Sequence, residues 1–157
     1  MINDIHGFRD PAMAEVTAAY DAAACLMHFQ DHCEYRDLIE DVREELTRAR
    51  ACALAAGVKE DKILLDPGIG FGKTREQNLA VLAHLDAFGD LGSPVLLGAS
   101  RKSVIGLTLD LPVDQRLEGT LATTALAVQA GYLFVRVHDV AANVRLIRML
   151  EAIRAYR

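Results

Sequence analysis

Short apolar segments alternate with longer helical patterns along the whole of this 157-residue chain. The apolar segments have the length of buried strands, whereas apolar residues recur every three or four positions between them, as in helices. The expected strands are Ile2–Ile5, Ala24–Phe29, Lys62–Leu65, Pro94–Gly98 and Tyr132–Val137. The expected helices are Pro11–Ala23, Tyr35–Ala56, Arg75–Phe88, Ser103–Leu107, Asp114–Ala130 and Ala141–Tyr156. Five such units predict an α/β fold with parallel strands and right-handed connections.

Parallel strands joined by helices form either an open doubly wound sheet or a (β/α)8 TIM barrel. Polar residues follow every expected strand at its carboxyl end: Asn3 and Asp4, His28 and Gln30, Asp66, Ser100 to Lys102, and Arg136 to Asp139. A barrel brings all of its strand ends to one mouth, whereas an open sheet has one crevice where the strand order reverses. We therefore expect a partial barrel. Because a complete barrel has eight units and about 250 residues, we also expect the chain to be truncated at its N-terminus.

The segment from Ile63 to Thr74, ILLDPGIGFGKT, carries the clearest sign of a site. The apolar run closes on Asp66, and Pro67 favours an extended conformation there, so the carboxylate stays on the strand. Three alternating glycines then allow a tight turn or a close approach to a ligand, although a strand-to-helix turn without function would also need glycine. The segment ends like a nucleotide P-loop, but the first glycine of that motif would have to occupy Pro67. A carboxylate beside the loop would also repel phosphate, so we do not expect a P-loop.

Composition and charge argue against several classes of protein. The net charge of −5 is atypical of a nucleic-acid binder, no apolar stretch has the length of a membrane span, and the N-terminus MINDIHGF lacks the regions of a signal peptide. Cys25, Cys33 and Cys52 are odd in number and lack zinc-type spacing, so we expect reduced thiols in a cytoplasmic protein. His28 and His32 lie near Cys33 in the sequence, but no second cysteine pair accompanies them, and we expect no metal site there.

Taken in order, the strand ends resemble the dihydropteroate synthase family of pterin-binding barrels. The resemblance covers essentially the whole chain, residues 1–157, as the C-terminal part of the barrel domain, the last five of eight βα units. Six motifs carry it: Asn3-Asp4-Ile5, Met27-His28-Phe29-Gln30, Asp66-Pro67-Gly68-Ile69-Gly70-Phe71-Gly72-Lys73, Gly98-Ala99-Ser100-Arg101-Lys102, Arg116-Leu117-Glu118-Gly119-Thr120 and Arg136-Val137-His138-Asp139-Val140. Each motif is short, but their joint order and spacing is highly specific.

The resemblance implies condensation of 4-aminobenzoate with (7,8-dihydropterin-6-yl)methyl diphosphate, which gives 7,8-dihydropteroate for folate biosynthesis and releases diphosphate. Asp66 would accept hydrogen bonds from the amino and ring N–H groups of the pterin, a donor edge that suits a carboxylate. Asn3 would bind another part of the ring. The implied catalytic residues are Lys102 beside the pterin carbonyl, Arg136 stacked on the ring while facing the diphosphate, and His138 on the diphosphate.

The other implied substrate-binding residues surround these groups. Ser100 would meet the carboxylate of 4-aminobenzoate, with Arg101 beside it, and Ile5, Met27 and Phe71 would line apolar walls. Catalysis would be mostly electrostatic, with cationic side chains and Mg²⁺ stabilising the departing diphosphate.

Ordinary structural roles are the alternative for these side chains. Arg136 and Asp139 could form an ion pair at a strand end, Arg101 and Lys102 could begin a solvated helix, and Met27 could belong to the core. Their coincidence at successive strand ends favours the functional interpretation for four residues: Asp66, Lys102, Arg136 and Asn3. The structural interpretation is favoured for four others: His28, Gln30, Asp4 and Asp139.

The chain also departs from the family. The missing units normally carry the asparagine that holds Mg²⁺, a second pterin-binding aspartate and two loops, so we assign no metal ligand and expect impaired activity. The loop from Asp31 to Tyr35 is much shorter than its counterpart. We expect a homodimer, because the family commonly dimerises through its C-terminal half. One alternative is a non-catalytic fragment that binds pterin or dimerises. Another is a methyltetrahydrofolate methyltransferase-like barrel, although its site would have no diphosphate or aminobenzoate for Ser100-Arg101-Lys102 to neutralise.

Overall fold

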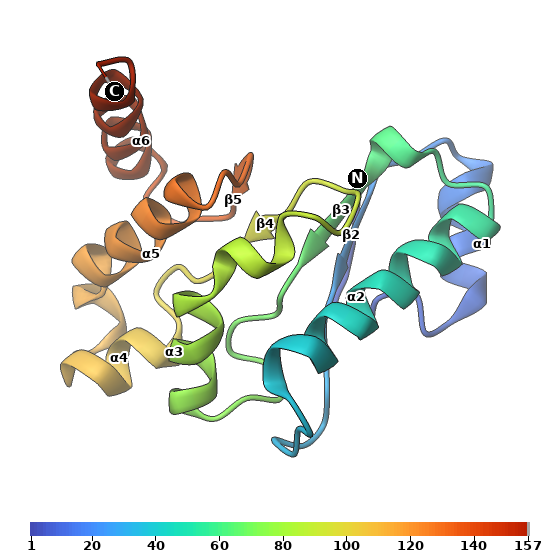
Figure 1. Cartoon of the computed structure of the whole chain (residues 1–157), viewed down its shortest axis with the longest axis horizontal. Helices are drawn as coiled ribbons and strands as arrows, with labels where there is room; N and C mark the ends of the chain where they lie inside the picture. The colour runs from blue at the N-terminus through green and yellow to red at the C-terminus, as the bar shows by residue number, and fades with distance from the viewer. Residues whose placement is uncertain (157) are drawn as a thin grey trace.

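A computed structural model describes residues 1–156 and shows an α/β fold in which strands and helices alternate (Figure 1). The strands are β1 (Ile2–Asp4), β2 (Ala24–Met27), β3 (Ile63–Asp66), β4 (Leu96–Leu97) and β5 (Phe134–Val135). The helices are α1 (Pro11–Ala19), α2 (Leu38–Ala55), α3 (Arg75–Ala83), α4 (Ser103–Leu109), α5 (Leu117–Gln129) and α6 (Val140–Arg154). Short 3₁₀ turns occupy Glu60–Lys62, Leu85–Phe88 and Val113–Gln115. The predicted alternation is confirmed.

All strand pairs are parallel, and their spatial order follows the chain. β1 pairs with β2, and β2 with β3, while β4 pairs with β5. A bridge between Leu65 and Val95 joins the two groups, with the Leu65 N–H donating to the Pro94 carbonyl at 3.0 Å. The order β1-β2-β3-β4-β5 therefore contains no reversal at which an open doubly wound sheet would form its crevice.

The sheet is strongly curved. Across four strand spacings of about 4.8 Å, the outer strands of a flat five-stranded sheet would lie roughly 19 Å apart. Yet Arg136, which directly follows β5, donates a hydrogen bond to Asn3 of β1 at 2.9 Å. Because an arginine side chain cannot span the flat sheet, the carboxyl ends of the two outer strands must curl toward each other.

The two faces of the sheet have different partners because side chains alternate along each strand. In β3, Ile63 and Leu65 pack into the main core between sheet and helices, which also contains Leu46 and Phe88. The opposite face holds a small cluster of Cys25, Leu64 and Leu96. Asp66 follows Leu64 on this second face, so the strand delivers its carboxylate to the inner, concave side of the curved sheet.

The structure shortens several expected helices for local reasons. The helix expected over Pro11–Ala23 ends at Ala19, shortly before Asp21, whose φ of 49° is left-handed. The helix expected from Tyr35 begins at Leu38, because the Asp37 carboxylate accepts the Ile39 and Glu40 N–H groups as an N-cap. The segment expected as Arg75–Phe88 becomes α3 and a separate 3₁₀ turn, and the one expected as Asp114–Ala130 is helical only from Leu117.

The last helix, α6, leaves most of its apolar side chains exposed. It packs against α5, where Asn143 is buried and accepts a hydrogen bond from the Thr124 hydroxyl at 2.6 Å. Its apolar residues Val144 and Ile153 remain 38% and 46% exposed. Figure 1 shows α6 standing away from the strands at one end of the molecule. Within residues 1–156, no helix combines the length and the apolar character needed to cross a bilayer.

Candidate functional site

A buried carboxylate lies at the carboxyl end of β3. Asp66 is 0% exposed, and its Oδ1 atom accepts a hydrogen bond from the Gly68 N–H at 2.8 Å. Its Oδ2 atom accepts one from the Arg136 guanidinium at 2.9 Å, which also forms an ion pair. The same guanidinium donates to Asn3, so the ends of β1, β3 and β5 meet at one place. Three predicted site residues, Asn3, Asp66 and Arg136, are thus brought together.

Gly98, directly after β4, leaves the space that this ion pair needs. A Cβ atom at this position would lie 2.5 Å from Arg136 Nη2 and 3.3 Å from Asp66 Oδ2. The first distance is far below a normal contact, so a larger residue would push the guanidinium away from the carboxylate. In the sequence Gly98 is only one residue of a motif. Its role in leaving space for Arg136 depends on the pairing of β4 with β5, which the sequence alone does not give.

Lys102 is held against the glycine-rich loop that follows β3. It directly precedes α4, its ammonium donates to the Ile69 carbonyl, and its Nζ atom lies 4.5 Å from the centroid of the Phe71 ring. The absence of a side chain at Gly70 lets the lysine stem pass, since a Cβ there would lie 3.1 Å from its Cδ atom. Burial lowers the pKa of Lys102 to about 8, with the Asp66 carboxylate opposing the shift. The ammonium therefore lies close to its deprotonation point at neutral pH.

Ser100 and His138 form a second contact between β4 and β5. The Ser100 hydroxyl lies 2.9 Å from His138 Nδ1 and accepts the His138 backbone N–H at 3.1 Å. Ser100 is buried, whereas His138 is exposed. The hydroxyl therefore fixes the position of the histidine while the outer part of the ring stays accessible to solvent.

Arg101 is engaged by the protein on several sides. Its guanidinium forms two hydrogen bonds with the Asp139 carboxylate, at 3.0 and 2.6 Å, and holds the pKa of that carboxyl below its ordinary value. Its left-handed backbone, with φ of 55°, is held by Thr120, which accepts its N–H at 3.0 Å, and by Arg116, which donates to its carbonyl at 3.0 Å. The suggested ion pair between Arg136 and Asp139 is therefore wrong, because the two residues have the partners Asp66 and Arg101 instead.

The predicted apolar wall residues differ in exposure. Met27 is 2% exposed and pairs with Asp66 in the register of β2 and β3. Phe71 is half-buried in the glycine-rich loop, and Ile5 is 37% exposed in the turn after β1. Asp4 shapes this turn, because its carboxylate accepts the His6 and Phe8 N–H groups. Asp4 therefore stabilises this turn through its carboxylate.

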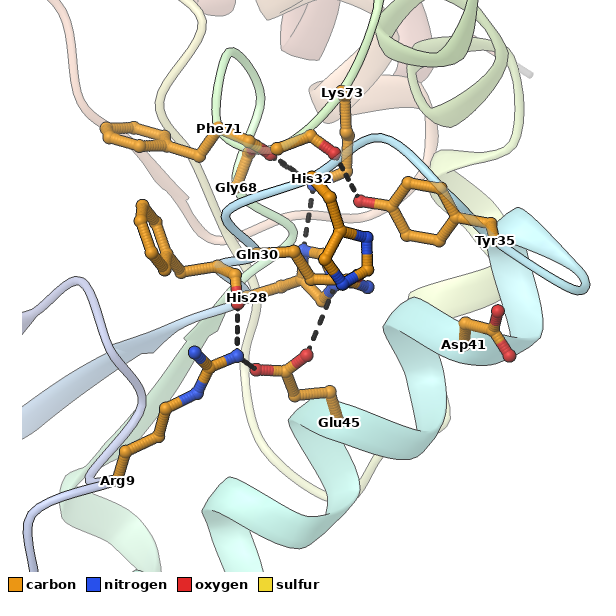
Figure 2. A network of polar contacts seen from close by, with 12 residues as sticks. Arg9, His28, Gln30, His32, Tyr35, Asp41, Glu45, Gly68, Phe71 and Lys73 are labelled. Atoms are coloured by element: carbon orange, nitrogen blue, oxygen red, sulfur yellow. Dashed lines mark hydrogen bonds and ion pairs between the residues drawn. The ribbon is translucent and has the colours of Figure 1, made fainter.

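A polar network lies beneath the glycine-rich loop (Figure 2), and the sequence does not predict most of its contacts. The Lys73 ammonium lies 2.8 Å from His28 Nδ1, and both side chains are buried. His28 Nε2 lies 3.3 Å from the Gln30 amide nitrogen and 3.4 Å from the Glu45 carboxylate on α2. Glu45 in turn pairs with Arg9 at 2.7 Å. The network links β2, the loop after β3 and helix α2.

Burial controls the charges in this network. It lowers the pKa of His28 to about 3, assisted by the positive charges of Lys73 and Arg9, so this histidine is neutral at neutral pH. It also lowers the pKa of Lys73 to about 7, although the carboxylates of Asp66 and Glu45 favour its charged form. Only the pattern of a lysine after the glycines was visible in the sequence, and nothing there indicated its partner 45 residues earlier.

No group of three or more His, Cys, Asp or Glu side chains suited to hold a metal ion comes together within residues 1–156. Asp66, the buried carboxylate at the strand ends, is paired with the guanidinium of Arg136. The positive charge of that partner opposes the approach of a cation.

Residues 1–138 match the family model described as pterin binding enzyme. The chain is 51% identical over 155 residues to a dihydropteroate synthase of Clostridium beijerinckii, covering 98% of this chain and 58% of the relative. It is 48% identical over 153 residues to a dihydropteroate synthase of Bacillus subtilis, covering 97% of this chain and 54% of the relative. The chain therefore spans little more than half the length of these relatives.

Solved structures show the same similarity. A dihydropteroate synthase of Clostridium difficile, crystallised in the presence of pteroic acid, has a TM-score of 0.94 and 48% identity, over 98% of this chain and 59% of that one. The Xanthomonas albilineans synthase with 4-aminobenzoic acid has a TM-score of 0.94 and 40% identity, over 99% and 57%. The Thermus thermophilus synthase in complex with 6HMPPP has a TM-score of 0.91 and 42% identity, over 96% and 60%.

The buried neutral His28 predicts a specific loss of stability in acid. Its pKa of about 3 in the folded chain lies below the ordinary value of 6.5, so the unfolded chain binds more protons between these two pH values. The contribution of His28 to the free energy of unfolding should therefore rise with pH from 3 to 6.5 and then level off, at up to about 5 kcal/mol. Urea unfolding across this pH range measures the free energy of unfolding.

His28→Gln should flatten the dependence of this free energy on pH, whereas His84→Gln, at an exposed position, should leave it unchanged. Equal slopes in His28→Gln and the wild type would contradict the low pKa assigned to His28.

Proposed function

Because this chain belongs to the pterin-binding enzyme family, with dihydropteroate synthases as its relatives, we propose that its strand ends form the pterin-binding part of such a synthase. The reaction is the condensation of 4-aminobenzoate with (7,8-dihydropterin-6-yl)methyl diphosphate in folate biosynthesis, in the cytoplasm. The synthases of known structure that were crystallised with 4-aminobenzoic acid or 6HMPPP support this choice of substrates.

The hydrogen bonds of the Asp66 carboxylate are the main support for this proposal. A carboxylate has about four lone-pair positions, two on each oxygen. Gly68 occupies one on Oδ1 and Arg136 occupies one on Oδ2. One position therefore remains on each oxygen, which matches the two neighbouring N–H donors on the edge of a pterin. Because Asp66 is 0% exposed, a side chain that covers it, such as that of Arg136, has to move for a pterin to reach these positions. The guanidinium of Arg136 compensates the buried negative charge, and carboxylate oxygens form strong hydrogen bonds with N–H donors.

The other residues follow from their place around this carboxylate. Asn3, on the far side of Arg136, binds a further polar edge of the ring, and Lys102 donates to the pterin carbonyl. The Arg136 side chain is 44% exposed, and its guanidinium offers its flat face to the ring and its charge to the diphosphate. His138, fixed by Ser100, binds the diphosphate, while Ile5, Met27 and Phe71 form apolar walls.

The proposed chemistry is displacement at the methylene carbon, in which the amine of 4-aminobenzoate forms the new C–N bond as the C–O bond to diphosphate breaks. Negative charge then grows on the departing diphosphate, and Arg136, Lys102 and His138 stabilise it electrostatically. Lys102, with a pKa of about 8, can also share its proton with an oxygen at neutral pH. Ser100 and Arg101 bind the carboxylate end of 4-aminobenzoate in this arrangement, although Arg101 would have to share its guanidinium with Asp139.

We further propose that the five strands are an arc of a TIM barrel, the last five of its eight βα units, within one domain over residues 1–157. The sequential strand order supports this, as does the contact between Arg136 and Asn3 from the two outer strands. An arc of a barrel curls in this way and directs its strand ends to a shared mouth.

The Mg²⁺ used by this family does not fit the side chains described in residues 1–156. They offer no group of three metal-binding residues, and the one fully buried carboxylate at the mouth is neutralised by Arg136. We therefore assign no step to a metal ion bound by this chain.

A second candidate function is pterin binding without synthase activity. It is favoured by the side chains described in residues 1–156, which form no group of three metal-binding residues. The methyltetrahydrofolate methyltransferase alternative has less support, because these relatives are named as synthases.

The purified 157-residue chain should show little or no synthase activity, since the part of the site that holds the metal is not among its described residues. Diphosphate release that depends on 4-aminobenzoate, followed by a coupled phosphate assay, measures it. Robust turnover at a rate comparable to that of the Bacillus subtilis relative would contradict this expectation and leave the full reaction to this chain alone.

Replacement of Asp66 by asparagine should weaken pterin binding. The asparagine NH₂ group would face the N–H donors of the ring, and the charged pair with Arg136 would be lost, so we expect at least a tenfold loss of affinity, about 1.4 kcal/mol. Isothermal titration calorimetry with pteroic acid measures it, after circular dichroism has shown that the variant folds. Asp61→Asn, in the exposed turn before β3, should bind like the wild type. Unchanged affinity in Asp66→Asn would remove this residue from the site.

We also propose that the chain forms a homodimer. Exposed leucines surround an apolar groove of about 300 Å³ between α3, α4 and α5, among them Leu79, Leu109 and Leu126. Burying such side chains against a second copy removes apolar surface from water. Sedimentation equilibrium should give about twice the 17.1 kDa of one chain, and Leu126→Glu should shift the mass toward the monomer. A monomer at every concentration would contradict the proposal.

A further inference from the structure

We propose that Lys73 is a positioning residue, whose buried ammonium holds the loop from Gly68 to Gly72 in the shape that orients Phe71 and Lys102. Lys73 itself is 9% exposed and contacts only the protein. The binding of a pterin by Lys102 rests on the function proposed above. The action of Lys73 on the loop does not depend on that function.

The ammonium of Lys73 has three hydrogens and finds three acceptors. It donates to the Gly68 carbonyl at 3.1 Å, to the Phe71 carbonyl at 3.2 Å and to His28 Nδ1 at 2.8 Å. Figure 2 shows these contacts converging on one nitrogen beneath the loop. A buried charge is tolerated when all of its hydrogens are bonded. The two carbonyls belong to the first and the fourth residue of the loop, so the lysine fixes its curvature from inside.

The third acceptor is available because His28 is neutral. Its low pKa leaves one ring nitrogen without a proton. We assign the proton to Nε2, which faces the carboxylate of Glu45 at 3.4 Å, and this leaves Nδ1 free to accept from Lys73. In this tautomer the Gln30 amide, 3.3 Å from Nε2, is turned so that its oxygen and not its NH₂ group faces the ring. Arg9, in the turn before α1, forms an ion pair with Glu45 on helix α2. Both residues therefore help to hold His28, and through it Lys73, in place. The network therefore gives the ammonium a fixed position.

The loop transmits this position to Lys102. The carbonyl of Phe71 faces Lys73, while its ring points away from it (Figure 2) and lies 4.5 Å from the Lys102 ammonium. Ile69, between the two clamped carbonyls, accepts a hydrogen bond from the same ammonium. An ammonium over an aromatic face is attracted by it, so a displaced ring would release the lysine. Lys73 therefore acts on Lys102 through the backbone of one short loop.

Other side chains secure the same loop without replacing Lys73. The Asn78 side chain accepts the Gly70 N–H at 2.6 Å, and the Tyr35 hydroxyl donates to the Gly72 carbonyl at 2.6 Å. Neither contacts the carbonyl of Phe71, whose side-chain donor is Lys73. Removing Lys73 should therefore leave the loop attached at Gly70 and Gly72 while the Phe71 ring changes its orientation.

The test follows the ring current of Phe71 at Lys102. The chain contains only four lysines, so each gives a resolvable signal after ¹³C-lysine labelling. At pH 6 Lys73 is charged and His28 is neutral, given their pKa values of about 7 and 3. In Lys73→Met the ε-CH₂ signal of Lys102 should lose at least half of the upfield shift that is lost in Phe71→Leu, which removes the ring itself. Lys59→Met, the same change at an exposed surface lysine, should leave the signal in place.

A folded Lys73→Met chain that keeps the wild-type Lys102 signal would overturn the proposal, because a purely structural lysine lowers stability without moving that signal. Should the methionine variant not fold, Lys73→Leu also lacks a donor, and its Lys102 signal decides by the same criterion. Titration with pteroic acid separates this proposal from the proposed function. A wild-type chain that binds no pteroic acid argues against the pterin site, and the Lys102 signal still decides on Lys73. Where the wild type binds, Lys73→Met should lose about fivefold in affinity and Lys59→Met should lose none.

Discussion

The ion pair between Asp66 and Arg136 is the interaction on which the rest of the site depends. Burying a carboxylate that is 0% exposed costs free energy unless a partner compensates its charge. Its partner comes from the end of β5, two strands away along the sheet, so the pair forms only where the sheet curves. Gly98 on the strand between them must lack a side chain for the same reason. The ion pair therefore forms only because the sheet is curved and because the residue at position 98 has no side chain.

Besides this ion pair, two ammonium groups bind the backbone of the glycine-rich loop. Two lysines, Lys73 and Lys102, donate to carbonyls of the same glycine-rich loop, one from a buried position and the other from the rim. The end of the loop thus resembles a P-loop in sequence but differs from it in the direction of its lysine. Its lysine turns inward to the backbone and to His28, where a P-loop lysine would face a phosphate. Two of its glycines allow close approach to another backbone segment, since a Cβ at Gly68 or Gly72 would lie 2.1 or 2.4 Å from the carbonyl oxygen of His28 or Gln30.

The sequence allowed the α/β class, the parallel strands and the coincidence of Asn3, Asp66 and Arg136 to be predicted, because hydrophobic periodicity and strand-end polarity are local signals. The helix starts at Leu38 and Leu117 were missed because caps and 3₁₀ turns depend on backbone geometry that periodicity does not report. The partners of Arg101 and Lys73 were missed for a different reason. They lie 38 and 45 residues away in the chain, and only the packing of the strands brings them close.

We propose that the two remaining lone-pair positions of Asp66 receive the donor edge of a pterin. A crystal structure of the chain with pteroic acid would show whether they do. We expect the amino and ring N–H groups of the pterin within hydrogen-bond distance of the two Asp66 oxygens, with the Arg136 guanidinium against the ring. A ligand bound elsewhere, or bound here with Asp66 contacting only Gly68 and Arg136, would contradict it.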